Sequence, residues 1–429
     1  MQESRPEFLH EAAAAGSVIA ADPGIASRAL RAERAGKRSG LSTGSSEFLG
    51  YARPDGSVGV RNHLLVLSLT GLTGPAARRI ARSLPGCRCV TMPYASGLLG
   101  EDAVAHERAL LGFASHPNVG AVVMVGGNKP ELLKMAQQLA RLDKPCEALA
   151  LDDCEHDALT LTDRAVRKGA ALAREISRQR RVSAPVSSLF VALECGRSDP
   201  SSGLVANPLV GRIADRLVDG GGRAAIGETV EWLGAEHLLA ARGATPTIGP
   251  AIIDAVQRRE ALAVDAGMDL LGNNPGPTNI DAGLSSIEEK SLGNIAKSGN
   301  RPIQGVIGYA EPPPAPGLWV MDAPAYAPES LTGFTAAGAQ LLLFTTGVGN
   351  SFVSELCPTI KLSANPVATR RLGQQLDFDA SAVIEGREPI EAAAERLFEA
   401  MLDVASGTLT WGEVLGEGEE VVSRFGPAL

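Results

Sequence analysis

Aromatic residues are scarce in this sequence, at 4% of 429 residues, and the net charge is −9. Few aromatic side chains leave little surface on which nucleic-acid bases could stack, and an acidic chain does not generally attract a phosphate backbone. The chain also lacks a Walker A motif and a G-x-G-x-x-G motif after its first predicted strand, which argues against a nucleotide-binding protein and an NAD-dependent oxidoreductase. We therefore expect a small-molecule partner and no nucleic acid.

Long apolar runs and a signal peptide are also missing. No apolar stretch reaches the roughly 20 residues of a membrane span, and the N-terminus, which carries Glu3 and Arg5, has no signal-peptide core. The six cysteines are scattered without the spacing of a disulfide framework. These absences favour a cytoplasmic protein with reduced cysteines and no membrane contact.

What the sequence does contain is an alternation of short apolar runs and amphipathic stretches, which predicts βαβ crossovers and parallel sheets. The fold class is therefore α/β, with two Rossmann-like parallel-sheet domains and a short N-terminal helical arm. Residues 1–48 are an Ala- and Arg-rich arm and linker, residues 49–182 the first α/β domain, and residues 183–429 a C-terminal α/β domain that carries most of the site.

Apolar runs mark the predicted buried strands, and 3.6-residue periodicity marks the predicted helices. Strands are expected at 63–69, 87–92, 119–125, 147–151, 189–193, 222–227, 305–309 and 340–345. Helices are expected at 75–83, 101–115, 130–142, 159–179, 207–219, 234–242, 250–267 and 390–405.

Three strand ends run into polar, Gly-rich loops, and ligands of open parallel sheets bind at such ends. The first loop offers Glu194 and Arg197, followed by Ser198, Asp199 and Ser202. Arg197 could bind a substrate carboxylate in a bidentate fork, the serines could bind hydroxyls, and Glu194 or Asp199 could bind a metal or transfer a proton. The alternative is a capped loop before a helix.

The second loop combines Asn273 and Asn274 with a Pro-Gly-Pro turn, and Lys290 follows it. A rigid turn holds amides at fixed angles, which suits recognition of a polyol, and a desolvated Lys290 could bind a carboxylate or act as a base. An ordinary turn and a solvated helix face are equally compatible with this pattern.

The third loop contains Thr345 and Thr346 before a Gly-rich turn, and Lys361 follows in a β-like stretch. Backbone N–H groups of such turns can bind an anion. Lys361 is either a buried functional group, which would make it a candidate base, or an edge-strand charge. Glu228 and His237 form a smaller group that could bind a metal together with Glu194, although a Glu-His pair on a helix is more often structural.

These segments, taken in order, resemble the altronate/galactarate dehydratase family, whose relatives include the large subunit of sulfolactate sulfo-lyase. The matching blocks cover about residues 49–420. They are 50–62, 116–119, 193–199, 228–237, 272–279, 288–293, 321–324, 331–333, 344–347, 358–361 and 415–419.

The resemblance implies a reaction in which a base removes the proton α to a carboxylate and a leaving group departs from the β carbon. It makes the chain a carbon–oxygen hydro-lyase or a carbon–sulfur lyase acting on a small hydroxylated or sulfonated acid. It also implies a divalent metal, Fe²⁺, Mn²⁺ or Mg²⁺, that stabilises the enolate-like intermediate.

The chain departs from the family where members carry Cys and His in the first α/β domain. In this chain the corresponding positions are 70–73, 94–97 and 126–129, and none of them carries the Cys or His that would be a soft metal ligand. Metal binding by second-domain oxygen ligands, metal-free catalysis and loss of activity all remain open. Lys129 could supply positive charge in place of a metal, and a catalytically diverged binding or regulatory subunit is the alternative to a lyase.

The second departure concerns a small SAF-type domain, which many relatives carry at the N-terminus or as a separate subunit. Residues 1–48 are too short and too rich in Ala and Arg to be that domain. We therefore expect either a separate small SAF-type partner subunit or a chain that works alone, and we expect a homo-oligomer.

Overall fold

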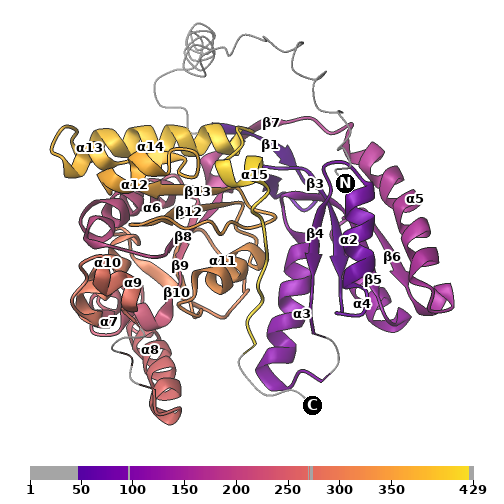
Figure 1. The fold of residues 1–429 in the computed structure, drawn as a ribbon, viewed down its shortest axis with the longest axis horizontal. Helices are drawn as coiled ribbons and strands as arrows, with labels where there is room; N and C mark the ends of the chain where they lie inside the picture. The colour runs from indigo at the N-terminus through magenta and orange to yellow at the C-terminus, as the bar shows by residue number, and fades with distance from the viewer. Residues whose placement is uncertain (1–46, 95–96, 269, 271–273, 425–429) are drawn as a thin grey trace, which may run out of the picture. The chain divides into compact units, whose positions relative to one another are not determined.

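Continuous apolar runs form the buried strands of the first α/β region, as predicted. The computed structural model describes residues 47–94, 97–268, 270 and 274–424. Four parallel strands lie in the order β4-β3-β5-β6, and β5 is buried along its whole length (Figure 1). The elements are β3 (His63–Ser68), α2 (Gly74–Ser83), β4 (Arg88–Thr91), α3 (Gly100–Ser115), β5 (Val119–Gly126), α4 (Lys129–Ala140), β6 (Cys146–Ala150), η1 (Asp152–Cys154) and α5 (Ala158–Ile176).

The second α/β region is built on seven parallel strands in the order β10-β11-β9-β8-β12-β13-β14. The α/β class with Rossmann-like parallel sheets is thereby confirmed. The strands are β8 (Phe190–Cys195), β9 (Arg223–Ile226), β10 (Ile303–Ile307), β11 (Gly317–Met321), β12 (Leu341–Thr345), β13 (Thr359–Ser363) and β14 (Phe378–Asp379).

Helices cover both faces of this sheet, which is why its strands are apolar on both sides. Side chains of α6 and α14 pack on one face, and those of α11 pack on the other. The helical segments are η3 (Ser202–Ala206), α6 (Asn207–Asp219), η4 (Thr229–Trp232), α7 (Glu236–Ala240), α8 (Ile248–Asp265), α9 (Pro277–Asp281), α10 (Ile287–Ala296), α11 (Ala327–Ala336), α12 (Pro366–Arg371), α13 (Ser381–Ile384), α14 (Ile390–Ala405) and α15 (Trp411–Leu415).

An antiparallel sheet of three strands, which the sequence did not predict, joins the two regions. It contains β1 (Glu47–Ala52), β2 (Val58–Gly59) and β7 (Val182–Pro185), which η2 (Val186–Ser188) follows. The strands β11 and β14 were also missed: β14 has only two residues, and β11 follows a Pro-rich stretch that is typical of a loop. The predicted arm lies outside the described residues, except for Glu47 and Phe48 in β1.

One apolar core runs between the two α/β regions, and residues 46–429 form one compact unit. Phe113 of α3 and Phe334 of α11 both belong to this core and are fully buried. The two helices approach so closely that a Cβ on Gly112 would lie 1.9 Å from the carbonyl oxygen of Ala336. A glycine is therefore required at this contact.

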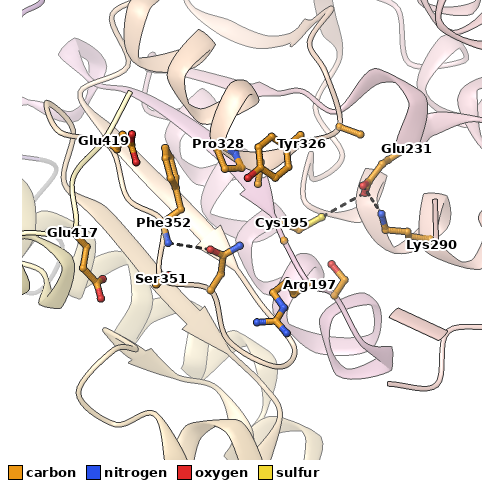
Figure 2. A pocket seen from close by; sticks show the side chains of 15 residues that line it. Cys195, Arg197, Glu231, Lys290, Tyr326, Pro328, Ser351, Phe352, Glu417 and Glu419 are labelled. Atoms are coloured by element: carbon orange, nitrogen blue, oxygen red, sulfur yellow. Dashed lines mark hydrogen bonds and ion pairs between the residues drawn. The ribbon is translucent and has the colours of Figure 1, made fainter. Parts of the chain in front are cut away.

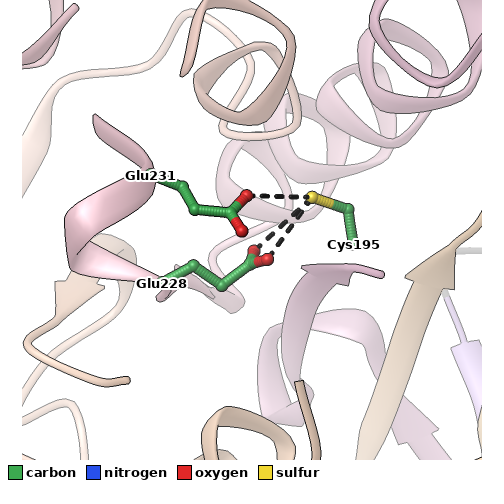
Figure 3. Close-up of side chains that lie close together, drawn as sticks. All are labelled: Cys195, Glu228 and Glu231. Atoms are coloured by element: carbon green, nitrogen blue, oxygen red, sulfur yellow. Dashed lines mark hydrogen bonds between the residues drawn. The ribbon is translucent and has the colours of Figure 1, made fainter. Parts of the chain in front are cut away.

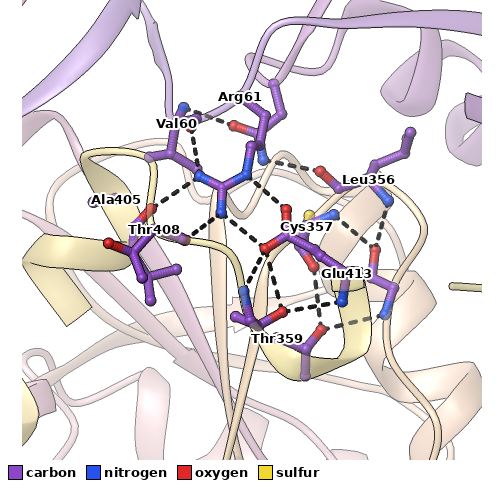
Figure 4. Close-up of polar contacts among 12 residues, drawn as sticks. Val60, Arg61, Leu356, Cys357, Thr359, Ala405, Thr408 and Glu413 are labelled. Atoms are coloured by element: carbon purple, nitrogen blue, oxygen red, sulfur yellow. Dashed lines mark hydrogen bonds and ion pairs between the residues drawn. The ribbon is translucent and has the colours of Figure 1, made fainter. Parts of the chain in front are cut away.

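A buried arginine adds a polar connection between the start and the end of this unit (Figure 4). Arg61 donates to both carboxylate oxygens of Glu413, at 2.7 and 2.8 Å, and to the carbonyl oxygens of Val404 and Thr408. Because its donors are satisfied, the buried guanidinium is accommodated without an unpaired charge. This contact holds α15, and with it the C-terminal segment, beside the second sheet.

Among the helices that the structure describes, none combines the length and the apolar character that a membrane span requires.

Candidate functional site

A cavity of about 730 Å³ lies where β8 ends, at the carboxyl edge of the second sheet (Figure 2). Loops after β8 and β12, the start of α11, the helix α10 and the segment after α15 all contribute to its wall. Its polar or charged lining side chains are Cys195, Arg197, Ser198, Glu231, Lys290, Tyr326, Asn350, Ser351, Glu417 and Glu419. This is the edge at which the sequence predicted a site.

Arg197 is the cation of the cavity wall that has no ion-pair partner among the described residues. Its backbone has a left-handed φ of 55°, and the N–H groups of Gly347 and Val348 donate to its carbonyl oxygen at 3.2 and 3.4 Å. The predicted anion-binding turn after Thr346 therefore holds the backbone of Arg197 in place. Its guanidinium remains available for a substrate carboxylate.

The β8 loop and the β12 loop are in close contact. A Cβ on Gly347 would lie 2.3 Å from Cγ of Asp199, so only glycine fits there. Asp199 accepts hydrogen bonds from Ser201, Ser202 and Asn365, at 2.6 Å from the Ser201 hydroxyl and 2.7 Å from the Asn365 amide. Asp199 therefore organises the loop, and its oxygens are already used.

At the cavity wall, Cys195 and Glu231 lie beside Glu228, and the three residues bring ligand-type atoms within 4.8 Å of one another (Figure 3). All three residues are buried. Glu228 has a left-handed φ of 65°, which places its side chain against Cys195 at 3.4 Å from Sγ to Oε1. Among the described residues, no other group of His, Cys, Asp or Glu side chains has this geometry.

Three residues of one helix face this group. Lys290, Asn294 and Lys297 follow each other at spacings of four and three, so they share one face of α10 and its C-terminal cap. Lys297 is fully buried, forms an ion pair with Glu228 and lies 3.3 Å from Sγ of Cys195. Lys290 forms an ion pair with Glu231 and a hydrogen bond with Oδ1 of Asn274.

Burial and the neighbouring charges decide which members of the group carry a charge. Burial, and then the charge of Glu228, raise the pKa of Glu194 well above its ordinary value, and the same two causes raise the pKa of the Cys195 thiol. Burial alone would lower the pKa of Lys297, but Cys195 and Glu228 more than offset it, so the pKa is raised. Burial also raises the pKa of Glu228, against the charge of Lys297, which lowers it. Lys297, whose pKa is raised, keeps its proton as an ammonium ion.

Lys290 titrates in the same direction. Burial opposes its charge, but the carboxylate of Glu231 outweighs this effect and raises the pKa of Lys290. Lys290 lines the cavity and keeps its proton, so it can stabilise a developing negative charge and donate a proton.

The arrangement around Cys195, Glu228 and Glu231 does not fit a divalent metal. Nδ2 of Asn294 donates to an atom of each residue, at 3.4 Å from Sγ of Cys195 and 3.0 Å from each carboxylate. Lys297 donates to Glu228 as well. Since N–H groups already occupy the space between the three ligands, a metal would have to displace both side chains.

The structure places the predicted site residues in different parts of the molecule. Arg197, Ser198 and Lys290 line the cavity. A second set is buried behind it or in its loops: Glu194, Asp199, Ser202, Asn274, Thr345, Thr346 and Lys361. Glu228 joins the buried acidic group, His237 is exposed on α7 away from it, and Asn273 lies outside the described residues.

Several buried residues support the wall without reaching the cavity. Lys361 donates to Glu417 at 2.9 Å, and Glu417 lines the cavity. Thr345 donates to Asn207 at 2.5 Å. Glu194 accepts from Ser330 at 2.7 Å.

Sequence reasoning missed Glu231, Asn294 and Lys297. The signal that could have found them is helical spacing, because 290, 294 and 297 repeat on one face, and Glu231 follows Glu228 by three residues. Lys129, considered as a substitute for a metal charge, instead pairs with Asp153 at 2.9 Å on the surface.

Comparisons with known proteins agree with the geometry. The C-terminal model of D-galactarate/altronate dehydratase matches residues 186–428, and the second-domain model of D-galactarate dehydratase/altronate hydrolase matches residues 50–179. The (2R)-sulfolactate sulfo-lyase subunit beta of Chromohalobacter salexigens is 36% identical over 88% of this chain and 97% of its own length.

Two dehydratases are also similar. Altronate dehydratase of Bacillus subtilis is 30% identical over 84% of this chain and 74% of its own length. Galactarate dehydratase (L-threo-forming) of Escherichia coli is 29% identical over 84% of this chain and 73% of its own length. One family model alone spans more than half of the chain, and it covers the cavity and the buried acidic group. The chain therefore belongs to the D-galactarate/altronate dehydratase family.

Proposed function

We propose that this chain is a lyase that removes water, or another β leaving group such as sulfite, from a small hydroxylated or sulfonated carboxylic acid. The observation that carries the proposal is the cavity after β8, where the unpaired guanidinium of Arg197 shares a wall with the Lys290–Glu231 pair. The relatives are named as dehydratases and as a sulfo-lyase subunit. The family resemblance implies that both kinds of reaction begin with removal of the proton α to the carboxylate.

Substrate binding rests on groups whose hydrogen-bonding capacity is unused. Arg197 binds the substrate carboxylate in a bidentate fork. The Ser198 hydroxyl lines the cavity, is buried and has no partner among the described residues. Nδ2 of Asn274 has none there either, but Asn274 lies behind the wall and reaches the site only through its Oδ1 contact with Lys290. Buried donors without partners are costly, so they fit the role of binding substrate oxygens.

The Lys290–Glu231 pair supplies the proton transfers. Glu231 accepts the proton from the carbon α to the carboxylate, and the electron pair forms the carbon–carbon double bond as the β substituent leaves. The ammonium of Lys290 stabilises the dianion and protonates a departing hydroxide, which leaves as water; a sulfonate leaves as sulfite. The enol product then becomes a 2-oxo acid. The raised pKa of Lys290 makes it the acid of this pair.

A binding or regulatory subunit without activity is the second candidate, which the missing first-domain ligands favour. The names of the relatives favour the lyase. The test is a panel of altronate, galactarate and sulfolactate, read out by 2-oxo acid, by sulfite and by exchange of the α proton in D₂O. Turnover or exchange would establish the lyase, whereas binding without either would establish the second candidate.

We also propose a separate small partner subunit and a cytoplasmic location. The relative named as a beta subunit matches over 97% of its length, against 74% and 73% for the dehydratases. All six cysteines are free, as expected in a reducing compartment. Co-purification from the native host tests the partner, and light scattering of the purified chain tests the expected homo-oligomer.

A further inference from the structure

The family implies a divalent metal, and the structure offers one group of ligand-type side chains that could hold it. That group is Cys195, Glu228 and Glu231. Whether it can serve this purpose depends on where its lone pairs point and on how its charge is balanced. Both can be followed in the contacts of α10.

The lone pairs are directed at nitrogen donors of this chain. One amide nitrogen, Nδ2 of Asn294, lies 3.0–3.4 Å from an atom of each ligand, which is the position that a bound metal would need. Metal–ligand distances of about 2.0–2.3 Å leave no room for an N–H group between ion and ligand. The ammonium of Lys297 closes the side between Glu228 and Cys195.

The charge of the group is already balanced. Glu228 pairs with Lys297, and Glu231 pairs with Lys290. A divalent cation at this group would have to replace Lys297 as the partner of Glu228 and Lys290 as the partner of Glu231.

Among the residues that the structure describes, the first α/β region contains no group of three His, Cys, Asp or Glu side chains with ligand geometry. A second cavity, of about 330 Å³, lies at the carboxyl ends of its strands and is lined by apolar side chains and by His106, Glu107, Glu131 and Lys134. Thr70, Tyr94 and Gly97 stand in its wall, at places where the family resemblance led us to expect soft ligands. His106 is the histidine of that wall; its Nε2 lies 2.9 Å from the carbonyl oxygen of Ser423 and its Nδ1 lies 3.2 Å from Sδ of Met92, so both ring nitrogens contact atoms of this chain.

We propose that this chain works without a divalent metal, and that the face of α10 formed by Lys290, Asn294 and Lys297 occupies the position of the cation. Lys290 is the catalytic member, because it lines the cavity. Lys297 and Asn294 are positioning residues that hold Glu228 and Glu231 and keep the buried charge balanced. The role assigned to Lys290 rests on the proposed lyase function, whereas the exclusion of a metal from this group does not.

The test measures metal binding directly and activity separately. The full chain, purified anaerobically from iron-supplemented cells, is examined for bound metal by elemental analysis, and its melting temperature is followed with Fe²⁺, Mn²⁺, Mg²⁺ and Zn²⁺. The proposal predicts no stoichiometric metal, no shift in melting temperature and no loss of turnover on chelation. One tightly bound ion per chain would overturn it, whether or not a Cys195→Ser variant loses that ion.

A second variant probes the position of the ammonium. Lys297→Ala opens the space beside Cys195 and Glu228, so added Zn²⁺ or Mn²⁺ should raise the melting temperature of this variant and not that of the wild type. Lys297→Arg, which keeps the charge, should behave as the wild type. A metal response of the wild type equal to that of Lys297→Ala would contradict the proposal.

If Lys297→Ala does not fold, the metal content of the wild type still decides. If turnover is absent but no metal binds, the lyase proposal fails and the exclusion of the metal stands.

Discussion

Each of the two α/β regions has a cavity at the carboxyl edge of its sheet, but different side chains line the two cavities. At the second sheet, the cavity of about 730 Å³ is lined by Arg197, Lys290 and Glu231. At the first sheet, the cavity of about 330 Å³ is lined by apolar side chains such as Leu69, Met92 and Met135 and, among its charged residues, by Glu107, Glu131 and Lys134. The fold determines where a ligand can bind, and the side chains at the strand ends determine whether chemistry follows.

The polar groups at the carboxyl edge of the first sheet contact other atoms of the chain and so stabilise the fold. The Ser68 hydroxyl contacts Thr73 Oγ1 and the carbonyl oxygen of Thr70, both at 2.8 Å. His106 lies against Sδ of Met92 at 3.2 Å, and burial lowers its pKa, so it remains neutral. At the second sheet, in contrast, Ser198 keeps an unpaired buried hydroxyl. Unused hydrogen-bonding capacity distinguishes the candidate site from its counterpart.

The largest expected effect concerns the lysine nearest the reacting atoms. Lys290→Met should lower kcat by roughly 10²–10⁴-fold, because it removes the proton donor and the charge that stabilises the dianion. The matched variant in the first region, Lys129→Met, removes only a surface pair with Asp153 and should leave kcat unchanged. Steady-state assays of 2-oxo acid formation compare the two. Equal losses in both variants would remove the distinction between the regions.

Each region also contains a buried lysine, and the two should differ in stability. Lys297→Met leaves the buried carboxylate of Glu228 without its cation and should lower the free energy of unfolding by about 3–5 kcal/mol. Lys144 donates only to backbone carbonyl oxygens, at 2.6 and 3.1 Å, and burial lowers its pKa to about 7. Lys144→Met should therefore cost far less in denaturant unfolding.

The pH dependence sharpens this comparison. Between pH 7 and 10.5 the folded state holds fewer protons on Lys144 than the unfolded state, so this residue makes the wild type more stable as pH rises. Lys144→Met should lose that rise. For Lys297, whose pKa is raised, the contribution is present below the ordinary lysine pKa and is lost only at higher pH. Urea unfolding of the wild type and the two variants at several pH values gives the contribution of each lysine to the free energy of unfolding. The contribution of Lys144 should rise with pH and that of Lys297 should fall, and parallel slopes of the two contributions would contradict the assigned charges.

Substrate binding should depend on Arg197. Arg197→Gln removes a charged donor to the carboxylate, a loss of about 1.5–3 kcal/mol that corresponds to a roughly 10–150-fold higher KM. The exposed Arg79 on α2 is the matched control, and Arg79→Gln should leave KM unaltered. An unchanged KM in Arg197→Gln would place the substrate carboxylate elsewhere.

The smallest expected effects concern two serines: one substitution should change KM, and the other should change stability. Ser198→Ala should raise KM several-fold and leave the melting temperature unchanged, because its hydroxyl has no partner among the described residues. Ser68→Ala removes a satisfied buried hydroxyl and should cost about 1 kcal/mol of stability without affecting KM. Calorimetry and kinetics on both variants test this pair, and a destabilised Ser198→Ala would assign that hydroxyl to the fold.

The sequence predicted the parallel strands well, because a run such as 119–125 is apolar on both faces and has few other ways to be buried. It did not predict the antiparallel pairing of β1 with β7, which joins segments more than 130 residues apart and has no local signal. Pairings of this kind depend on tertiary packing.

For the site, the predicted loops after β8 and β12 meet at the cavity, but the sequence did not show which of their side chains reach it. Lys361 reads as a functional lysine in the sequence, yet the structure pairs it with Glu417 behind the wall. Lys297 was not singled out in the sequence, yet it is fully buried against Glu228. The direction of a side chain depends on the packing of its element, so the sequence alone could not distinguish these two lysines.

The central claim is that the cavity after β8 binds the substrate through its carboxylate. A crystal structure of the Lys290→Met variant, soaked with the acid that the wild type turns over, tests it most directly. We expect density for the carboxylate within hydrogen-bonding distance of the Arg197 guanidinium, with a substrate hydroxyl on Ser198. Density for the acid in the apolar cavity beside Leu69 and Met92, or at any place away from Arg197, would contradict this account.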